Sequence, residues 1–194
     1  MAAIRSDAFT PDGRLKVAPT TPLLVLFHTP WCGYCKRLMP AWHAFARTID
    51  PAKLQLAVVD CEAAPVPFVE AYPTLLLYSN ASAAKPPTNI EPSAIHLAAA
   101  TQGKEASVVF YHAAWCSHCT ASAPEVDAFE RASHGAVRVI RINAEQAPEV
   151  VARRGVRAFP TIQVVANGKH TERVGRVNRH QLMSFYQESA RALQ

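Results

Sequence analysis

Trp31-Cys32-Gly33-Tyr34-Cys35 and Trp115-Cys116-Ser117-His118-Cys119 are two versions of one motif in a single chain. Each motif follows a short apolar run, Leu23–Phe27 in the first half and Val108–Tyr111 in the second. A short apolar run of this kind predicts a buried strand. Two cysteines at this spacing, where a strand passes into a helix, can form a disulfide that exchanges easily. The sequence therefore indicates thiol–disulfide chemistry at two places.

The similarity between the two halves extends beyond the cysteines. Leu24–Cys32 aligns with Val108–Cys116, and Pro40 and Pro124 each lie five residues beyond the second cysteine. Proline inside a helix costs about 3 kcal/mol, so its return at the same offset indicates a shared helix. We predict two domains, residues 1–102 and 103–194. An aromatic-Pro-Thr triplet follows each motif, at Tyr72-Pro73-Thr74 and Phe159-Pro160-Thr161.

Hydrophobic periodicity predicts strands and helices in the same order in both halves. In the first half we expect strands at 23–28, 54–60 and 74–79, helices at 33–48 and 92–100, and a loop at 80–88. In the second half we expect strands at 108–112, 137–142, 161–166 and 169–174, and helices at 117–133, 148–154 and 178–193. The second half is expected to begin directly at its first strand, without a preceding helix.

The composition of the 194 residues fits a compact soluble protein, with 49% hydrophobic and 18% charged residues. No apolar stretch approaches the ~18 to 20 residues that cross a bilayer, and residues 1–7 lack the apolar core of a secretory signal. We therefore expect a cytoplasmic monomer without membrane contact. An oxidising compartment is the alternative if a signal has been removed. No nucleic-acid motif accompanies the net charge of +5, so we expect no nucleic-acid binding.

Five cysteines are too few for a disulfide-stapled scaffold. The fifth, Cys61, is interpreted as a small buried side chain. Four thiolates can bind zinc, but Cys35 and Cys116 are separated by a whole domain, whereas zinc ribbons space their pairs by ~15 to 20 residues. We expect no metal and no other cofactor, with the disulfides as redox groups and an external thiol as electron donor or acceptor. A metal or iron–sulfur protein is the less favoured alternative.

Both halves resemble the thioredoxin superfamily, and more narrowly its protein disulfide isomerase branch. The two cysteine motifs, the helix prolines, the aromatic-Pro-Thr triplets and Asn167-Gly168-Lys169 carry the resemblance, which covers nearly the whole chain. It implies an α/β architecture of two tandem thioredoxin-like folds, each a central mixed sheet flanked by helices. It also implies that Pro73 and Pro160 are cis and face the cysteines. The backbone of Tyr72 or Phe159 would then pair with an extended substrate.

Each cysteine has a predicted role. Cys32 and Cys116 are expected in the first turn of a helix, where free N–H groups and the helix dipole favour a thiolate. They are expected to attack a substrate, and Cys35 and Cys119 to resolve the mixed disulfide. Trp31 and Trp115 are expected to shape the rims of the two sites.

Several polar side chains are candidates for modulating the thiolates. His118 lies between the second pair of cysteines, where an imidazolium would stabilise the Cys116 thiolate and make the second site the more oxidising. Tyr34 offers only a hydroxyl in the first site. His28 and His112 each lie four residues before a first cysteine. Each histidine is either a proton acceptor or thiolate partner, or a packed ring at the strand end.

The chain departs from the family where it would usually place a buried acid. That acid stands six positions before the first cysteine, and Leu26 and Phe110 occupy its positions here. The basic residue that often accompanies it is replaced by Leu56 and Val139. In the first half, the segment between Asp60 and Pro73 is short and is interrupted by Pro65 and Pro67, so its usual helix is expected to be cut down.

The predicted function is protein thiol–disulfide oxidoreductase, acting on protein or peptide thiols and disulfides together with an upstream reductase or oxidase. The direction is open. His118 and Tyr72-Pro73 favour an oxidase or isomerase, whereas the lack of a signal favours a cytosolic reductase. The alternative is a non-catalytic, chaperone-like protein that uses the clefts beside Pro73 and Pro160, because the resolving cysteines lack the buried acid.

Overall fold

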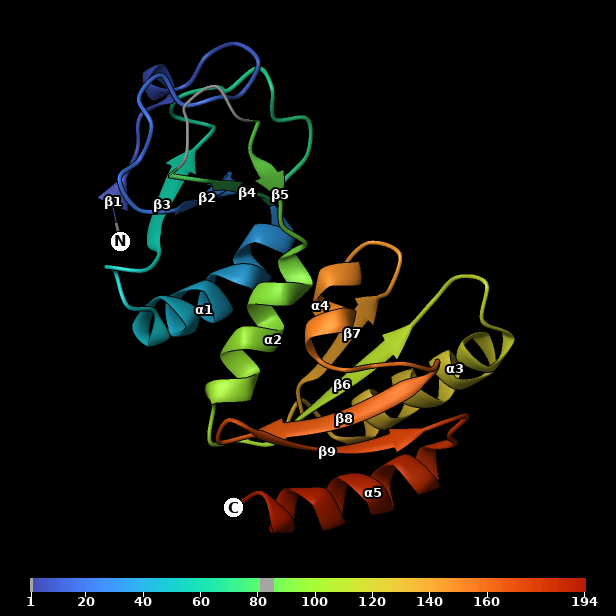
Figure 1. The fold of residues 1–194 in the computed structure, drawn as a ribbon. Coiled ribbons are helices and arrows are strands. Elements are labelled where there is room, and N and C mark those ends of the chain that lie inside the picture. Colours follow the sequence, from blue (N-terminus) through green and yellow to red (C-terminus); the bar gives the residue numbers. More distant parts are fainter. Residues whose placement is uncertain (1, 81–85) are drawn as a thin grey trace. The chain divides into compact units, whose positions relative to one another are not determined.

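The structure is a computed structural model that describes residues 2–80 and 86–194 (Figure 1). The chain divides into two compact units, Met1–Ile95 and His96–Gln194. Each unit is a central mixed sheet with flanking helices, which confirms the predicted tandem α/β folds. The predicted loop at 80–88 falls largely on residues 81–85, which lie outside the described part of the chain. Among the described residues, no helix has the length and apolar character needed to span a bilayer.

The first unit is built on a five-stranded sheet in the order β1-β3-β2-β4-β5. The central strand β2 (Leu23–His28) pairs in parallel with β3 (Gln55–Asp60) and antiparallel with β4 (Thr74–Tyr78). Short edge strands, β1 (Ala2–Ala3) and β5 (Thr88–Asn89), complete the sheet. All residues of β2 except the last are buried, as expected for a strand covered on both faces.

Helix α1 (Gly33–Thr48) lies against one face of this sheet (Figure 1). Leu38 and Trp42, four residues apart, are buried on one side of the helix, as the apolar stripe of an amphipathic helix would be, and Trp42 has no exposed surface. Pro40 lies inside the helix, as its repeated offset predicts. The helix therefore begins directly after Cys32 and is held in place by its buried stripe.

Irregular chain covers the other face of the first sheet. The ring of Phe9, which follows the short 3-10 helix η1 (Ser6–Ala8), lies 5.4 Å from that of Phe27 and 5.7 Å from that of Phe68. Gly13 has a φ of +82°, and a Cβ there would lie 2.8 Å from Cδ2 of Phe68, so this turn requires glycine. Residues 61–73 contain turns and no helix, which confirms that the usual helix is cut down.

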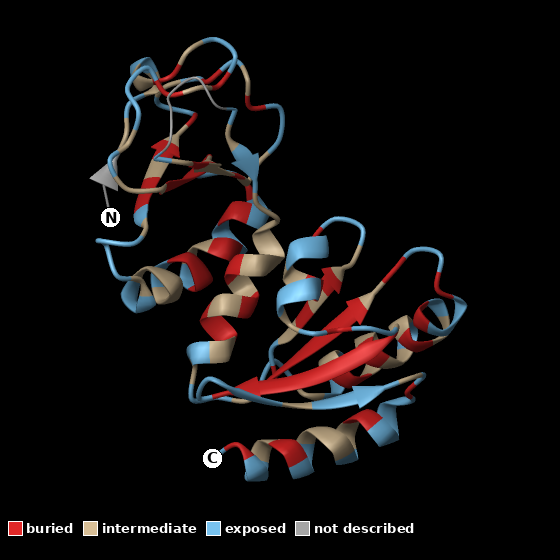
Figure 2. Cartoon of the chain, viewed as in Figure 1, coloured by how far each residue is buried: buried red, intermediate tan, exposed pale blue. Residues whose placement is uncertain are grey.

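The second unit has a four-stranded sheet in the order β7-β6-β8-β9. β6 (Ser107–His112) pairs in parallel with β7 (Val139–Asn143) and antiparallel with β8 (Thr161–Ala166). β9 (Lys169–Val174) pairs antiparallel with β8 through a tight turn. Both turn residues, Asn167 and Gly168, have positive φ, as the predicted two-residue hairpin turn requires. β8 is buried along its whole length, whereas β9 is largely exposed (Figure 2).

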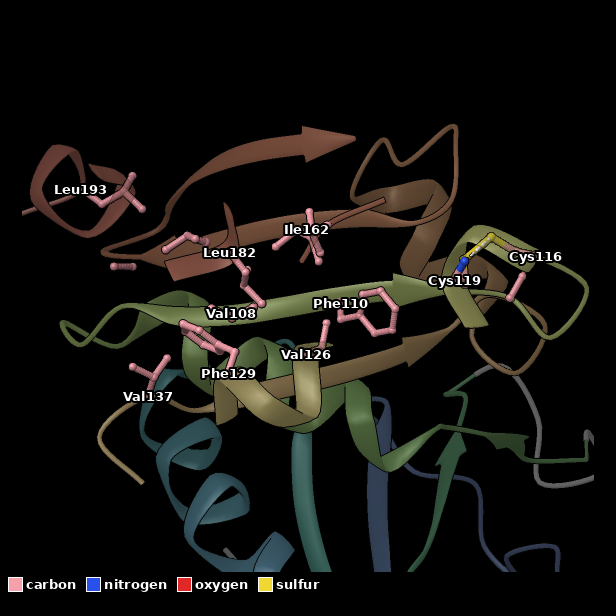
Figure 3. Packing of buried hydrophobic residues seen from close by; sticks show 14 residues of the cluster. Val108, Phe110, Cys116, Cys119, Val126, Phe129, Val137, Ile162, Leu182 and Leu193 are labelled. Atoms are coloured by element: carbon pink, nitrogen blue, oxygen red, sulfur yellow. Dashed lines mark hydrogen bonds between the residues drawn. A yellow bond between two sulfur atoms is a disulfide. The ribbon is translucent and has the colours of Figure 1, made fainter. Parts of the chain in front are cut away.

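Two helices bury one face of the second sheet (Figure 3). Val126 and Phe129 of α3 (Ser117–Ala132) and Leu182 of α5 (Arg179–Ala192) have no exposed surface. They join a single cluster with Val108, Phe110 and Ile162 of the sheet. Pro124 lies inside α3, at the offset that Pro40 has in α1. The matching prolines and buried stripes support the derivation of both helices from one pattern.

A helix that precedes the first strand of the second half covers the opposite face of the second sheet, contrary to expectation. The second half was predicted to begin without a helix before its first strand, yet Leu97 and Ala100 of α2 (Pro92–Gln102) pack in one cluster with Val109 and Tyr111 of β6. The short helix α4 (Pro148–Arg153) contributes Val151 to the same cluster. Ile95 and Ala99, on another side of α2, are also buried. A helix that is buried on several sides has no single apolar stripe. For this reason, periodicity did not predict that α2 packs on the sheet of the second unit.

Candidate active site

The first cysteine pair lies where β2 leads into α1. Cys32 is the N-cap residue of α1, and its Sγ accepts a hydrogen bond from the backbone N–H of Cys35 at 3.2 Å. The Cys32 thiol also donates to the carbonyl oxygen of Tyr72 at 3.4 Å. The Tyr72-Pro73 peptide bond is cis, so the aromatic-Pro-Thr triplet does reach the cysteine as the resemblance implies. Cys32 is 6% exposed and Cys35 only 2%.

The surroundings of the two thiols push their pKa values in opposite directions. Burial opposes ionisation of Cys32 more than any other single influence. Hydrogen bonds from Cys35 and from the backbone of Tyr34, together with the Arg37 charge, outweigh burial and lower the pKa of Cys32. Burial, and then the neighbouring Cys32 thiolate, raise the pKa of Cys35 to about 11. Cys32 is therefore suited to be the nucleophile, and Cys35 holds its proton until late in the exchange.

Aromatic side chains form the rim of the first site. Trp31 is 64% exposed, and its ring meets the ring of Tyr72 edge-on with 6.1 Å between centroids. Tyr34 is 70% exposed, and the Arg37 guanidinium lies 4.4 Å above its ring. Sequence reasoning missed Arg37, although its spacing of three residues from Tyr34 on a helix is a usable signal.

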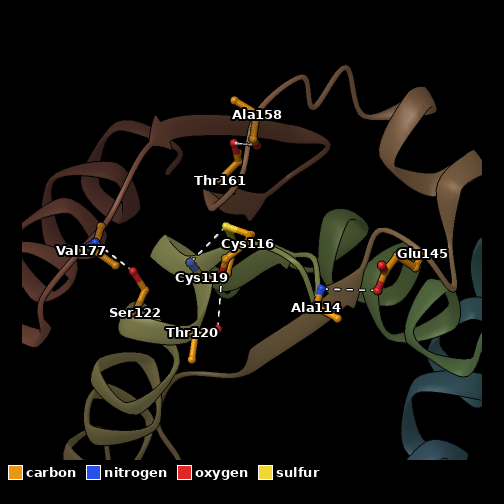
Figure 4. The surroundings of a disulfide bond; sticks show 9 residues. All are labelled: Ala114, Cys116, Cys119, Thr120, Ser122, Glu145, Ala158, Thr161 and Val177. Carbon is orange, nitrogen blue, oxygen red and sulfur yellow. Dashed lines mark hydrogen bonds between the residues drawn. A yellow bond between two sulfur atoms is a disulfide. The ribbon is translucent and has the colours of Figure 1, made fainter.

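The second cysteine pair repeats this geometry in the disulfide form (Figure 4). Cys116 is the N-cap of α3, and its Sγ accepts from the backbone N–H of Cys119 at 3.1 Å. The Phe159-Pro160 bond is cis, as predicted. Trp115 is 71% exposed, and its ring meets that of Phe159 edge-on at 5.9 Å. The rim of the second site therefore matches the rim of the first.

The histidines occupy different surroundings. His118 is exposed in the first turn of α3, and its influence on Cys116 stays a prediction. His28 is half-buried at the end of β2, where its backbone carbonyl accepts from the N–H of Cys61 at 2.9 Å. His112 is also half-buried, and its ring stacks on Phe110 with 5.3 Å between centroids. Burial, and then the Arg141 charge, lower the pKa of His112, and Glu145 opposes them.

Charged residues near the second site were not found from the sequence. The family's basic residue is absent at Val139, but Arg141 stands two residues later, in register with Phe110. Its guanidinium donates to Asp127 at 2.6 Å and to Glu130 at 2.7 Å, both on α3. Arg141 lies outside the positions that the family pattern defines. The i, i+3 spacing of the two carboxylates on one helix was the available signal.

Cys61 lies in the core of the first unit, as interpreted from the sequence. It is 5% exposed and packs in a cluster with Phe27 and Val59. Burial raises the pKa of its thiol. Within residues 2–80 and 86–194, no three His, Cys, Asp or Glu side chains gather in a group that would hold a metal ion.

The fold and the site define a class of protein: tandem sheets, each presenting a Cys-x-x-Cys pair at a helix N-terminus beside a cis proline. A family profile for thioredoxin matches residues 13–100 and again 93–188. The chain belongs to the thioredoxin family, and the two matches overlap at residues 93–100.

The chain is similar to several larger proteins. DnaJ homolog subfamily C member 10 of Mus musculus is 26% identical over 170 residues, covering 73% of this chain and 21% of that protein. Protein disulfide-isomerase 1 of Dictyostelium discoideum is 27% identical over 183 residues, covering 73% of this chain and 50% of that protein. The chain thus spans half or less of the length of these relatives.

Among solved structures, the crystal structure of ERdj5 form II is 20% identical, with a TM-score of 0.41, and the match covers 91% of this chain and 28% of that one. Thioredoxin of Fasciola hepatica is 26% identical with a TM-score of 0.42, covering 45% of this chain and 84% of that one.

Proposed function

We propose that this chain is a protein thiol–disulfide oxidoreductase that exchanges disulfides with protein substrates at both cysteine pairs. The observation that carries the proposal is the place of Cys32 at the N-cap of α1, where its Sγ accepts from the N–H of Cys35 and lies against the cis Tyr72-Pro73 peptide. These surroundings lower the pKa of Cys32 and raise that of Cys35. A purely structural disulfide does not require one thiol with a lowered pKa beside another with a raised pKa, whereas thiol–disulfide exchange does. The similarity to a protein named protein disulfide-isomerase supports the same activity.

The exchange takes two steps in each site. The Cys32 thiolate attacks one sulfur of a substrate disulfide, forms a mixed disulfide and releases the other substrate sulfur as a thiolate. Cys35 then loses its proton and attacks the Sγ of Cys32, which forms the intrachain disulfide and releases the second substrate sulfur. The substrate gains two electrons and two protons, and the cysteine pair is oxidised. The same steps in reverse transfer a disulfide to a substrate.

The exposed rims support protein substrates. Trp31, Tyr34 and Trp115 present large aromatic surfaces to solvent next to the cysteines. Aromatic side chains of this kind dominate contacts with protein partners. The same surfaces favour the alternative of a chaperone-like protein that binds peptides without turnover, so activity has to be tested directly.

Reduction of insulin by dithiothreitol tests the proposal. We expect the single variants Cys32→Ser and Cys116→Ser each to lose part of the activity, and the double variant to lose it entirely. Cys61→Ala is the matched control, because it removes a thiol that lies in the core of the first unit. Full activity in the double variant would refute the proposal and leave the peptide-binding alternative.

The reduction potential of each pair tests the direction. A value near −270 mV marks a reductase, and a value near −180 mV marks an isomerase or oxidase, on the scale of about 30 mV per 1.4 kcal/mol. We propose that the second pair is the more oxidising, because an imidazolium at His118 would stabilise the reduced form. An equal or lower potential at the second pair than at the first would contradict this part.

A further inference from the structure

A cavity of about 400 Å³ lies beside the second cysteine pair. Cys119 forms part of its wall, together with His112 at the end of β6, Asp127 on α3 and Arg141 on β7. Most of the wall is apolar, but these three polar side chains give water partners for hydrogen bonds, and the space is large enough to hold several water molecules. The resolving cysteine of the second site therefore faces an open cavity that contains His112, Asp127 and Arg141 rather than a sealed core.

His112 occupies a fixed place in that cavity. It lies two residues after Phe110 on β6, so both side chains point to the same face of the sheet. Their rings stack at an interplanar angle of 18°, which fixes the orientation of the imidazole. His112 therefore lies on the face that α3 covers, which is the helix that carries Cys119.

Burial, more than the surrounding charges, favours the neutral form of His112. Arg141 on β7 is a cationic group that acts on it, and Asp127 and Glu130 of α3 bind that guanidinium. Glu145, in the loop after β7, accepts from the backbone N–H of Ala114 at 3.3 Å (Figure 4). Burial and Arg141 lower the pKa of His112 despite Glu145. At neutral pH its imidazole has a free lone pair that can accept a proton.

The first site offers an internal comparison. Leu26 and Val58 stand in register where the second site has Phe110 and Arg141. His43 and Ala46 of α1 occupy the positions of Asp127 and Glu130, eleven and fourteen residues after the first cysteine. The arginine–carboxylate group is therefore specific to the second site.

We propose that His112 accepts the proton of Cys119, through water in this cavity, when the second site resolves its mixed disulfide. The inference rests on the proposed function. In this step the S–H bond of Cys119 breaks and the imidazole takes the proton. Cys119 then attacks the Sγ of Cys116, the Cys116–Cys119 bond forms, and the bond from Cys116 to the substrate sulfur breaks. The substrate sulfur leaves as a thiolate, and the His112 imidazolium returns its proton through the water to that thiolate, which restores the neutral imidazole. Arg141, in the wall of the same cavity, is a positioning residue that acts with burial against protonation of His112.

The test follows both steps with 5,5′-dithiobis(2-nitrobenzoate) in the full chain. The parent protein carries Cys32→Ser, Cys35→Ser and Cys61→Ala, so that only the second pair reacts. Attack by Cys116 releases one coloured thiolate, and resolution by Cys119 releases the other. The variant His112→Asn is compared with His180→Asn, which replaces an exposed histidine at the start of α5.

We expect His112→Asn to leave the first phase unchanged and to slow the second phase by about 100-fold at pH 7, the size typical of general base catalysis. In the parent, the second phase should become independent of pH above the pKa of His112. In the variant, it should rise about tenfold per pH unit, because only the free thiolate then reacts. Free imidazole in the buffer should restore part of the variant's second phase.

Equal second phases in the parent and in His112→Asn would overturn the proposal. So would a parent second phase that rises tenfold per pH unit without a plateau, and this result decides the matter even if His112→Asn does not fold. A parent that shows no first phase at all would instead refute the proposed function, because Cys116 would then not act as a nucleophile.

Discussion

Replacing Gln163 with methionine removes the centre of a buried polar network in the second unit. Gln163 lies in the middle of β8 and has no exposed surface. Its Oε1 accepts from the hydroxyl of Tyr111 at 3.1 Å and from Nε and Nη2 of Arg154 at 3.2 and 3.0 Å. Its Nε2 donates to Glu172 at 2.9 Å. Methionine keeps the shape of the side chain and removes all four hydrogen bonds.

The expected loss of unfolding free energy depends on which hydrogen-bond partners of Gln163 can bind water instead. The Tyr111 hydroxyl is fully buried, so losing its acceptor costs about 1–3 kcal/mol. Arg154 is half-buried and Glu172 is exposed, so water replaces much of what they lose. We therefore expect Gln163→Met to lower the free energy of unfolding of the second unit by about 2–3 kcal/mol. Adding Tyr111→Phe removes the stranded hydroxyl, and the double variant should lose only about 1 kcal/mol.

Amide hydrogen exchange of β6 and β8 in the full chain measures this quantity, because these buried strands exchange only when the second unit opens. A Gln163→Met protein within about 0.5 kcal/mol of the parent would refute the reasoning, since such a change is typical of surface substitutions. A double variant that loses the sum of the two single losses would refute it as well.

Three further predictions follow from the site and the cores. With a disulfide substrate at neutral pH, Cys35→Ser should accumulate a mixed disulfide at Cys32 that mass spectrometry detects, whereas Cys32→Ser should not. Because the folded protein lowers the pKa of His112, the unfolded chain binds that proton at higher pH. The free energy of unfolding of the second unit should fall as the pH drops below about 6.5, and His112→Asn should reduce this fall in urea titrations. Trp42→Ala should destabilise the first unit by about 3–5 kcal/mol in the same titrations.

Each of these predictions has a clear contrary result. Equal trapping by Cys35→Ser and Cys32→Ser would remove the distinction between attacking and resolving thiols. An unchanged pH dependence in His112→Asn would mean that this imidazole titrates alike in the folded and unfolded chain. Trp115→Ala is the control for the core substitution, because Trp115 is exposed and its loss should change the unfolding free energy by less than about 0.5 kcal/mol.

The repeated motif predicted the strands and helices that carry the cysteines. The limits of α1, β2, β8 and β9 agree with the expected ranges. Apolar patterning marks α1, β2 and β8, and the Asn167-Gly168 turn fixes where β8 ends and β9 begins. The two cis prolines followed from the family resemblance and not from the spacing.

Other features could not be predicted because tertiary contacts decide them. Two-residue strands such as β1 and β5 have no periodicity of their own. The packing of Leu97 and Ala100 of α2 against β6 is a tertiary contact that the sequence of the helix alone does not specify. Arg141 reads as an ordinary strand residue until β7 is set in register with β6, and only then does it lie beside Phe110 and the carboxylates of α3.

The pH dependence of alkylation at each cysteine of the reduced chain, followed by mass spectrometry, tests the central claim most directly. The surroundings of α1 should make Cys32 react at a lower pH than a free thiol, whose pKa is near 8.5. Cys35 should react only near its pKa of about 11. If Cys32 and Cys35 both titrate near 8.5, their surroundings do not separate them, and the proposed catalytic roles fail.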